Sequence, residues 1–190
     1  MKAMQRPDEV DMEAPVIEAV LAGDRFAFEE LVRRHDRWVR SVVFGALADR
    51  NALDDVVQQV WTTAWRRIGE LRDATRWKPW LYRLARNAAY DAGRELKRRR
   101  QLAQAGTGST GATASFGGDS IDEEQRKLVL SAIEALPAIY REPFVLRHVN
   151  GWSYQRIGDV MGLPVDTVET RLVRARRLLR EALEGKVNQS

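Results

Sequence analysis

The sequence contains no cysteine, and only two of its 190 residues are histidines. The absence of cysteine excludes disulfides, thiolate zinc sites and cysteine nucleophiles. We expect His35, which lies among apolar helix positions, and His148, which lies at the end of a predicted helix, to be packed or half-exposed side chains rather than metal ligands. The sequence therefore predicts neither a bound metal nor a cofactor.

Long apolar runs are also missing. No stretch approaches the roughly 18 uncharged apolar residues that a membrane span needs. The opening residues, MKAMQRPDEVDMEAPV, contain no apolar segment of the kind found in signal peptides. We therefore expect a cytoplasmic protein with no membrane insertion, beginning with a disordered tail over residues 1–14.

Positive charge is in only mild excess, since 31 Lys and Arg against 27 Asp and Glu give a formal net charge of +4. An anionic partner is compatible with this balance, but the distribution of charge says more than the total. One segment, QLAQAGTGSTGATASFGGDS from Gln101 to Ser120, has a single charged residue in a chain that is 31% charged. Its Gly, Ser, Thr and Ala content is typical of a flexible linker.

This segment divides the chain into two predicted domains, over residues 15–100 and 122–186, with the linker at 101–121 and a short tail at 187–190. Both domains are predicted to be helical, because period-3.6 patterns recur in them and no segment shows sustained alternation of apolar and polar residues. The predicted helices cover residues 26–46, begin near 54 and 77, cover 122–136 and 137–148, and end with a short helix and a long one.

A turn between the last two helices has its own signature in GWSYQRIGDVMGLPV. Ser153 is placed to cap the short helix, Gly158 is small enough for a second helix to cross closely, and Gly162 suits a left-handed position at the helix end. Pro164 pre-sets the backbone for the next helix. The predicted fold class is all-α: two small helical domains joined by a flexible linker, the second containing a helix-turn-helix.

The final helix, VDTVETRLVRARRLLR, carries five arginines in its last ten residues beside an unbroken apolar stripe. In a helix-turn-helix the first turns of the second helix meet base edges in the major groove, where arginine can donate two hydrogen bonds to guanine. Arginines further along are better placed for phosphates. The candidates for base edges are Asp166, Thr167, Thr170, Arg171 and Arg174, and those for phosphates are Arg176, Arg177 and Arg180.

Two further helix faces are exposed in the first predicted domain. One face is basic and has an aromatic residue among side chains that end in hydrogen-bonding groups, which suits binding of single-stranded nucleic acid. Tyr90 is the candidate for stacking on a base. The other is polar with little net charge, which fits either a solvated surface or a protein partner. The first face contains Arg76, Arg83, Asn87, Tyr90, Arg94 and Lys97, and the second contains Asp55, Gln58, Gln59, Thr62 and Arg66.

Three segments in a fixed order closely resemble the extracytoplasmic function (ECF, group 4) sigma factors of the sigma-70 family. They are ALDDVVQQVWTTAWRR, WKPWLYRLARNAAYDAGRELKRRR and LPAIYREPFVLRHVNGWSYQRIGDVMGLPVDTVETRLVRARRLLRE. The resemblance extends from about Val16 to Leu183. It implies a subunit without enzymatic activity that binds core RNA polymerase, recognises the minus-35 and minus-10 promoter elements, melts DNA and directs transcription initiation.

The resemblance also implies roles for the exposed faces. The polar face matches the segment that docks on the clamp coiled coil of the largest polymerase subunit. The loop GELRDATR at 69–76 looks like the loop whose pocket receives a flipped minus-10 base. The linker resembles the segment that is threaded through the polymerase channels. Further implied partners are the polymerase flap, promoter DNA in duplex and melted form, and an anti-sigma factor. The implied sites are Asp55, Val57, Gln58, Gln59 and Thr62 for polymerase, Arg76, Arg83, Asn87, Tyr90, Asp91, Arg94 and Lys97 for the minus-10 element, and Thr167, Thr170, Arg171, Arg174, Arg176 and Arg177 for the minus-35 element.

Three positions depart from the family pattern. The family usually has an acidic residue where Gln59 stands, a glycine where Asp166 stands and a glutamate where Arg156 stands. The change at Gln59 is expected to weaken clamp binding, and the change at Asp166 to alter the promoter sequence that is recognised. The change at Arg156 removes a capping interaction worth about 1 kcal/mol at most.

A stand-alone helix-turn-helix regulator and a nucleic-acid enzyme are the two alternative functions. A stand-alone helix-turn-helix regulator usually dimerises on two half-sites, and no spare apolar seam follows the last helix. A nucleic-acid enzyme needs a metal-binding carboxylate cluster or a nucleophile with its base. The tight acidic pair Asp54 and Asp55 is better explained as the N-terminus of a helix, where carboxylates are stabilised.

Overall fold

The computed structural model describes residues 13–106 and 121–187. In these two ranges all regular structure is helical and no strand occurs, as the predicted all-α class requires. The elements are α2 (Ala14–Leu21), α3 (Arg25–Leu47), α4 (Leu53–Arg67), the 3-10 turns η1 (Ile68–Glu70) and η2 (Ala74–Arg76), α5 (Trp77–Gly106), α6 (Ile121–Ala135), α7 (Ala138–His148), α8 (Tyr154–Met161) and α9 (Val165–Val187).

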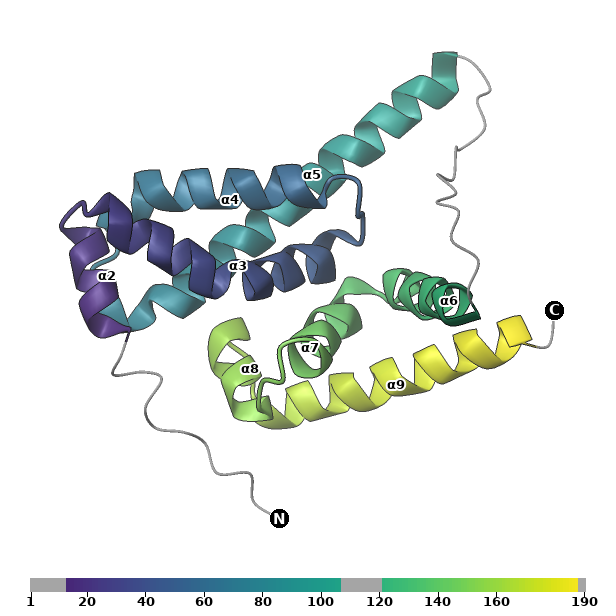
Figure 1. Ribbon diagram of the computed structural model, residues 1–190. Helices are drawn as coiled ribbons and strands as arrows, with labels where there is room; N and C mark the ends of the chain where they lie inside the picture. Colours follow the sequence, from purple (N-terminus) through teal and green to yellow (C-terminus); the bar gives the residue numbers. More distant parts are fainter. Residues whose placement is uncertain (1–12, 107–120, 188–190) are drawn as a thin grey trace.

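The first domain is built around α3, which contacts α2, α4 and α5 (Figure 1). Asp24 starts α3 by accepting hydrogen bonds from the backbone N–H groups of Phe26 (2.8 Å) and Ala27 (3.2 Å), which satisfies two donors that a helix end leaves free. The apolar stripes of the helices form the core, in which Val39, Val43 and Val60 are fully buried. The last turns of α5 project beyond this body (Figure 1).

Two elements differ from the sequence prediction. Helix α2 was not expected, although Ile17 and Val20 occupy i and i+3 positions and are buried against the core. Helix α5 continues to Gly106, six residues into the predicted linker, because the added residues up to that glycine are mostly Ala, Gln and Leu, which favour helix. Residues 107–120 of the predicted linker and most of the two predicted tails lie outside the described residues, and the last residue of the predicted linker, Ile121, begins α6.

The second domain contains the predicted helix-turn-helix in α8 and α9. The Ser153 hydroxyl caps α8 by accepting from the Arg156 backbone N–H at 3.1 Å, and Gly162 ends it with a left-handed φ of 69°. A methyl group on Gly158 would lie 2.7 Å from the carbonyl oxygen of Leu163. The glycine is therefore needed for the close approach of the turn itself, rather than for a crossing helix as the sequence indicated.

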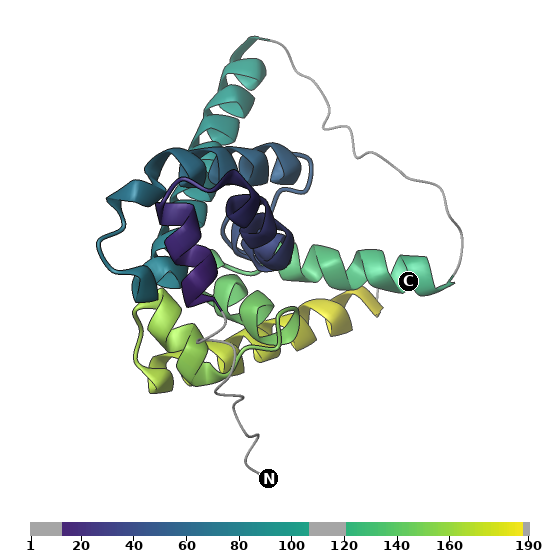
Figure 2. The same cartoon turned by 60° about the vertical axis from the view of Figure 1, so that its left-hand side comes forward.

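The two domains pack directly against each other. Helix α7 lies along α3, and α8 contacts α5 (Figures 1 and 2). The rings of Trp38 and Trp152 meet with their centroids 5.5 Å apart, and Leu146 and Ile157 join the same buried apolar cluster as the first-domain core. The structure is thus a closed arrangement of both domains, which no local sequence pattern indicated.

Candidate nucleic-acid interface

Helix α9 presents its predicted DNA-contacting residues on the side away from the buried stripe. Two of its polar groups have partners that DNA would have to replace: Arg174 donates to the Tyr140 hydroxyl at 3.4 Å, and Arg177 pairs with Glu181 at 3.0 Å. Thr170 instead donates to the backbone carbonyl of Asp166 at 2.8 Å. Exposed residues of the predicted set are Asp166, Thr170, Arg174, Arg176, Arg177 and Arg180, and half-buried ones are Thr167 and Arg171.

Most of the predicted basic face of the first domain is also exposed. Asp91 and Arg94 form an ion pair on this face, one helical turn apart. Exposed residues are Arg76, Arg83, Asn87, Arg94 and Lys97.

Tyr90 differs from the rest of this face. Its ring is half-buried, and its hydroxyl donates to Glu142 of the second domain at 2.7 Å. Burial first, and the Glu142 carboxylate second, raise the pKa of Tyr90 above its ordinary value. The exposed stacking platform expected from the sequence is therefore not available in the closed arrangement.

A groove of about 330 Å³ lies between α4 and α5. It brings Gln59, predicted to bind polymerase, next to Arg83 and Asn87, predicted to bind the minus-10 element. Trp80 supplies part of the apolar lining. The two predicted surfaces of the first domain are therefore adjacent.

The predicted polymerase-binding face of α4 is solvent-exposed at Asp55, Gln58, Gln59 and Thr62. Val57, also implied as a polymerase contact, is instead 2% exposed and belongs to the core, because it lies on the apolar side of α4. Sequence reasoning missed Trp65, which is 39% exposed and packs against Phe28 with ring centroids 4.9 Å apart. Its position three residues after Thr62 on the same helix was the signal that could have identified it. The face therefore includes an aromatic residue of the type that often anchors protein interfaces.

His35 is a core side chain, as expected. It is 7% exposed, and its ring lies 4.7 Å from that of Trp77. Burial, with smaller effects of the nearby Lys78, Arg34 and Arg156, lowers the pKa of His35 to about 4. Among the described residues, no group of three or more His, Cys, Asp or Glu side chains is arranged to hold a metal ion.

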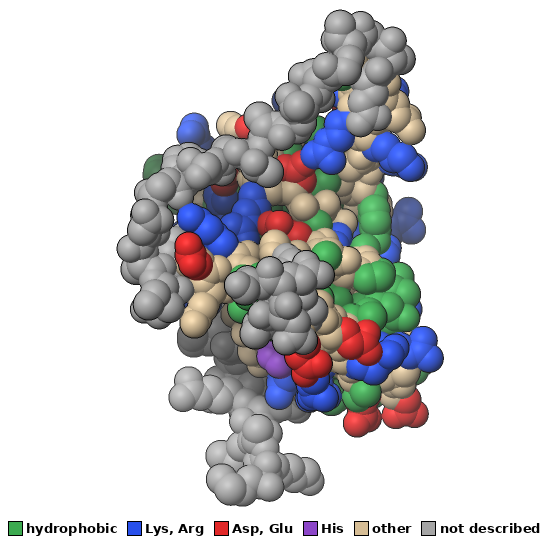
Figure 3. Space-filling view, turned by 90° about the vertical axis from the view of Figure 1, so that its right-hand side faces the viewer, with side chains coloured by type: hydrophobic (Ala, Val, Ile, Leu, Met, Phe, Trp, Pro, Cys, Tyr) green, Lys and Arg blue, Asp and Glu red, His purple; other side chains and the backbone are tan. Residues whose placement is uncertain are grey.

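Basic and acidic side chains are interspersed over one face of the molecule, with Lys and Arg gathered near the projecting end of α5 (Figure 3). Within residues 13–106 and 121–187, no helix has the length and apolar character needed to cross a bilayer.

The comparisons with known proteins agree with this geometry. The family model for sigma-70 region 2 matches residues 31–100, and the model for sigma-70 region 4 matches residues 126–179. The ECF RNA polymerase sigma-E factor of Escherichia coli K12 is 33% identical over 181 residues, covering 90% of this chain and 92% of the relative. The chain belongs to the ECF sigma factors of the sigma-70 family. The sigma factor therefore directs transcription initiation by RNA polymerase, and the stand-alone regulator is not supported.

Other relatives extend this result. The RNA polymerase sigma factor CarQ of Myxococcus xanthus is 33% identical over 162 residues, covering 85% of this chain and 91% of CarQ. The structure of CnrH in complex with the cytosolic domain of CnrY covers 92% of this sigma factor and 99% of that chain, with 25% identity and a TM-score of 0.68. The sigma factor RpoE of Bartonella quintana, solved with the anti-sigma factor NepR, shares the fold at 24% identity and a TM-score of 0.62, covering 83% and 96% of the two chains.

The two matched regions contain the predicted site residues except Arg180, which lies one residue beyond the region 4 match. The region 2 match includes the α4 and α5 faces from Asp55 to Lys97, and the region 4 match includes the α9 residues from Thr167 to Arg177. The surfaces identified from charge and exposure are therefore on the parts of the chain that define the family.

Proposed function

We propose that this sigma factor, a group 4 member, reads promoters with two separate surfaces. The exposed side of α9 contacts the minus-35 duplex, with Thr167, Thr170, Arg171 and Arg174 at base edges and Arg176 and Arg177 at phosphates. The exposed side of α5 contacts the melted minus-10 strand. The observation that carries this proposal is the α8–α9 helix-turn-helix with an exposed arginine-rich side.

The α4 face is the proposed docking surface for the clamp coiled coil of core polymerase. Its polar residues and the partly exposed Trp65 support this assignment, since aromatic anchors surrounded by polar groups are typical of protein interfaces. The proposed contact of the second domain is the polymerase flap. The catalytic chemistry belongs to the polymerase, and the proposed place of action is the cytoplasm.

An anti-sigma factor is a further proposed partner. Two relatives of known structure, CnrH and the Bartonella RpoE, were solved in complex with CnrY and the anti-sigma factor NepR, respectively. A protein that covers the α4 and α9 faces would block polymerase and promoter together.

The test is run-off transcription by bacterial core polymerase, with and without the sigma factor, on a library of random promoter-length DNA whose transcripts are sequenced. We expect transcripts that depend on the sigma factor and start at a fixed distance from two short motifs. Arg174→Ala should weaken selection of the upstream motif, and Asn87→Ala that of the downstream motif. Tight duplex binding without any stimulated transcription would contradict the proposal.

A further inference from the structure

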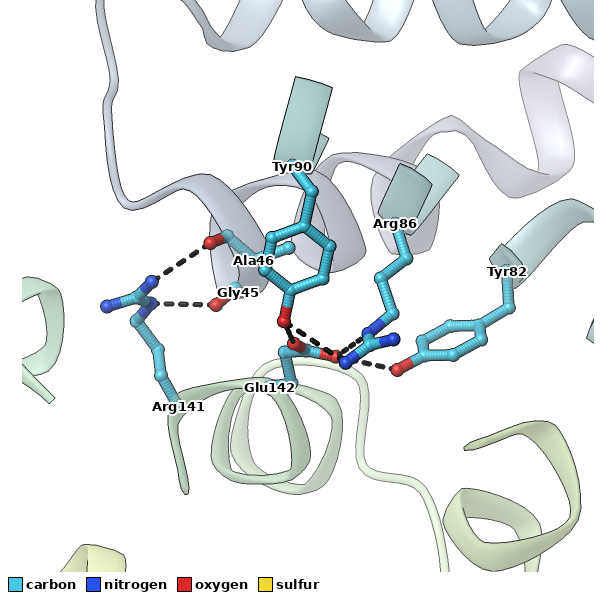
Figure 4. Close-up of polar contacts among 7 residues, drawn as sticks. All are labelled: Gly45, Ala46, Tyr82, Arg86, Tyr90, Arg141 and Glu142. Atoms are coloured by element: carbon cyan, nitrogen blue, oxygen red, sulfur yellow. Dashed lines mark hydrogen bonds and ion pairs between the residues drawn. The ribbon is translucent and has the colours of Figure 1, made fainter. Parts of the chain in front are cut away.

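Glu142 is a buried carboxylate at the contact between the two domains. It is 3% exposed and lies on α7 of the second domain. Its Oε2 atom accepts from the Tyr82 hydroxyl at 2.7 Å and from Arg86 Nε at 2.8 Å, and its Oε1 atom accepts from the Tyr90 hydroxyl at 2.7 Å (Figure 4). The three donors stand four residues apart on α5 and so share one face of that helix. One carboxylate therefore ties a single side of α5 to α7.

The neighbouring residue, Arg141, makes a second tie between the domains. Its guanidinium is buried and donates to the carbonyl oxygens of Gly45 (2.7 Å) and Ala46 (3.1 Å) in the last turn of α3 (Figure 4). It also donates to the carbonyls of Glu134 (2.8 Å) and Leu136 (2.5 Å) at the end of α6. Carbonyls at helix ends lack intrahelical partners and favour a nearby cation. Arg141 therefore joins two helix C-termini, one from each domain.

Gly45 allows the backbones to come close at this point. A methyl group added there would lie 3.2 Å from the Cα atom of Glu142, which is tighter than ordinary packing. The position is in the interior of α3, where glycine is otherwise unfavourable for the helix. The glycine is therefore explained by the approach of α7 rather than by the first domain alone.

The closed arrangement conflicts with binding both promoter elements. Their names place the elements about 25 base pairs apart, or roughly 85 Å along B-form DNA. A 190-residue chain folded as one body has a radius of gyration of about 16 Å and thus a diameter of about 40 Å. The two reading surfaces must therefore move apart, and Tyr90 must leave Glu142 before its ring can stack on a base.

We propose that Arg141 and Glu142, with their first-domain partners Gly45, Ala46, Tyr82, Arg86 and Tyr90, form a clasp that holds the free sigma factor closed. The consequence for promoter access rests on the proposed function, whereas the clasp itself is a property of the free chain. The clasp can release, because water satisfies the same carboxylate, hydroxyl and guanidinium groups once the domains separate. It therefore biases the closed state without making it permanent.

The test measures domain separation in the free protein. Because the chain has no native cysteine, Glu29→Cys on α3 and Glu181→Cys on α9 place two spin labels at exposed positions, and pulsed EPR gives their distance distribution. We expect one short distance in the otherwise unchanged protein. Glu142→Ala should raise the population of longer distances at least tenfold, and Gly45→Val should do the same by wedging α7 away.

The matched control is Glu184→Ala, an exposed glutamate of the second domain, which should leave the distribution unchanged. Circular dichroism checks that helix content is kept in each variant. If Glu142→Ala does not fold, Tyr82→Phe removes one clasp hydrogen bond while keeping the ring in the core, and it must still raise the long-distance population. Folded clasp variants with the unchanged short distance would overturn the proposal, as would a free protein that is already open. Neither polymerase nor DNA is present, so this result is independent of the transcription test.

Discussion

Arg141 and Arg174 carry the same guanidinium group, but the first is 6% exposed and the second lies on the surface of α9. Burial lowers the pKa of Arg141 below its ordinary value, yet a guanidinium remains charged at neutral pH. Four carbonyl oxygens replace the water that it has lost. Arg174 is exposed to solvent and donates to the Tyr140 hydroxyl at 3.4 Å. The same residue type is thus structural in one place and available to a ligand in the other.

Replacing the buried guanidinium should be costly. Arg141→Met keeps an apolar stem but leaves four carbonyls without their donor, and each unsatisfied buried group costs about 1–3 kcal/mol. We expect the free energy of unfolding, measured with urea, to fall by at least about 3 kcal/mol. Arg180→Met, on the exposed side of α9, should change it by less than about 0.5 kcal/mol. Equal effects of the two substitutions would show that Arg141 is not a structural tie.

The exposed arginines of α9 should separate into two kinds. Arg174→Ala should relax base preference at one minus-35 position by about 1–3 kcal/mol, because a bidentate contact to guanine is lost. Arg177→Ala should weaken binding to all sequences alike and reduce the slope of log K against log salt concentration by about one. Duplex-binding titrations of the holoenzyme at several salt concentrations measure both. An unchanged base preference in Arg174→Ala would remove it from the base-reading set.

His35 should make stability depend on pH. Its pKa is about 4 in the folded protein against an ordinary 6.5, so below pH 6.5 the unfolded chain binds a proton that the folded chain does not. The stabilisation is complete above pH 6.5 and is lost as the pH falls towards 4. From pH 7.5 to 5, His35 should account for at most about 2 kcal/mol of lost unfolding free energy, because the Glu13 carboxylate, 3.3 Å from its Nε2 atom, favours the protonated ring. His35→Phe should abolish this pH-dependent loss of unfolding free energy, measured by urea titrations at several pH values. His148 is more exposed, so His148→Gln should reduce the loss much less.

At the scale of elements, the short-range signals predicted the structure well. The starts of α3, α4, α5 and α9 and the turn between α8 and α9 follow from caps, glycines and apolar periodicity, which act over a few residues. The clasp was not predicted, because Tyr82 and Glu142 are 60 residues apart and no local pattern encodes their meeting. The role of Tyr90 was missed for the same reason: the helical wheel placed it on the basic face, but its partner lies in the other domain.

The turn of the helix-turn-helix provides a test at this scale. Gly158→Ala should displace the Leu163 carbonyl, since the new methyl group would lie 2.7 Å from it, and so re-orient α9 relative to α8. We expect at least a tenfold loss of minus-35 binding by the holoenzyme. Gly93→Ala in α5, where a methyl group meets only the end of the Leu47 side chain at 3.4 Å, should be neutral or stabilising for the fold. Retained minus-35 affinity in Gly158→Ala would contradict this explanation of the turn.

At the scale of the whole molecule, the sigma factor combines the two proposed promoter-reading surfaces with the proposed clasp that keeps the two domains together. The apolar contact of Trp38 with Trp152 adds to the clasp, so separation needs binding free energy from a partner that prefers the open form. Core polymerase is the proposed source, because it engages both domains. The free protein should accordingly bind promoter DNA weakly.

The central claim is that a sigma factor closed by its own clasp is opened by polymerase. The most direct measurement is the EPR distance between labels at positions 29 and 181, recorded for the free protein and again with an excess of core polymerase. The account predicts a short distance in the free protein and a long one, of several tens of ångströms more, in the complex. The same short distance in a transcriptionally active complex would contradict it.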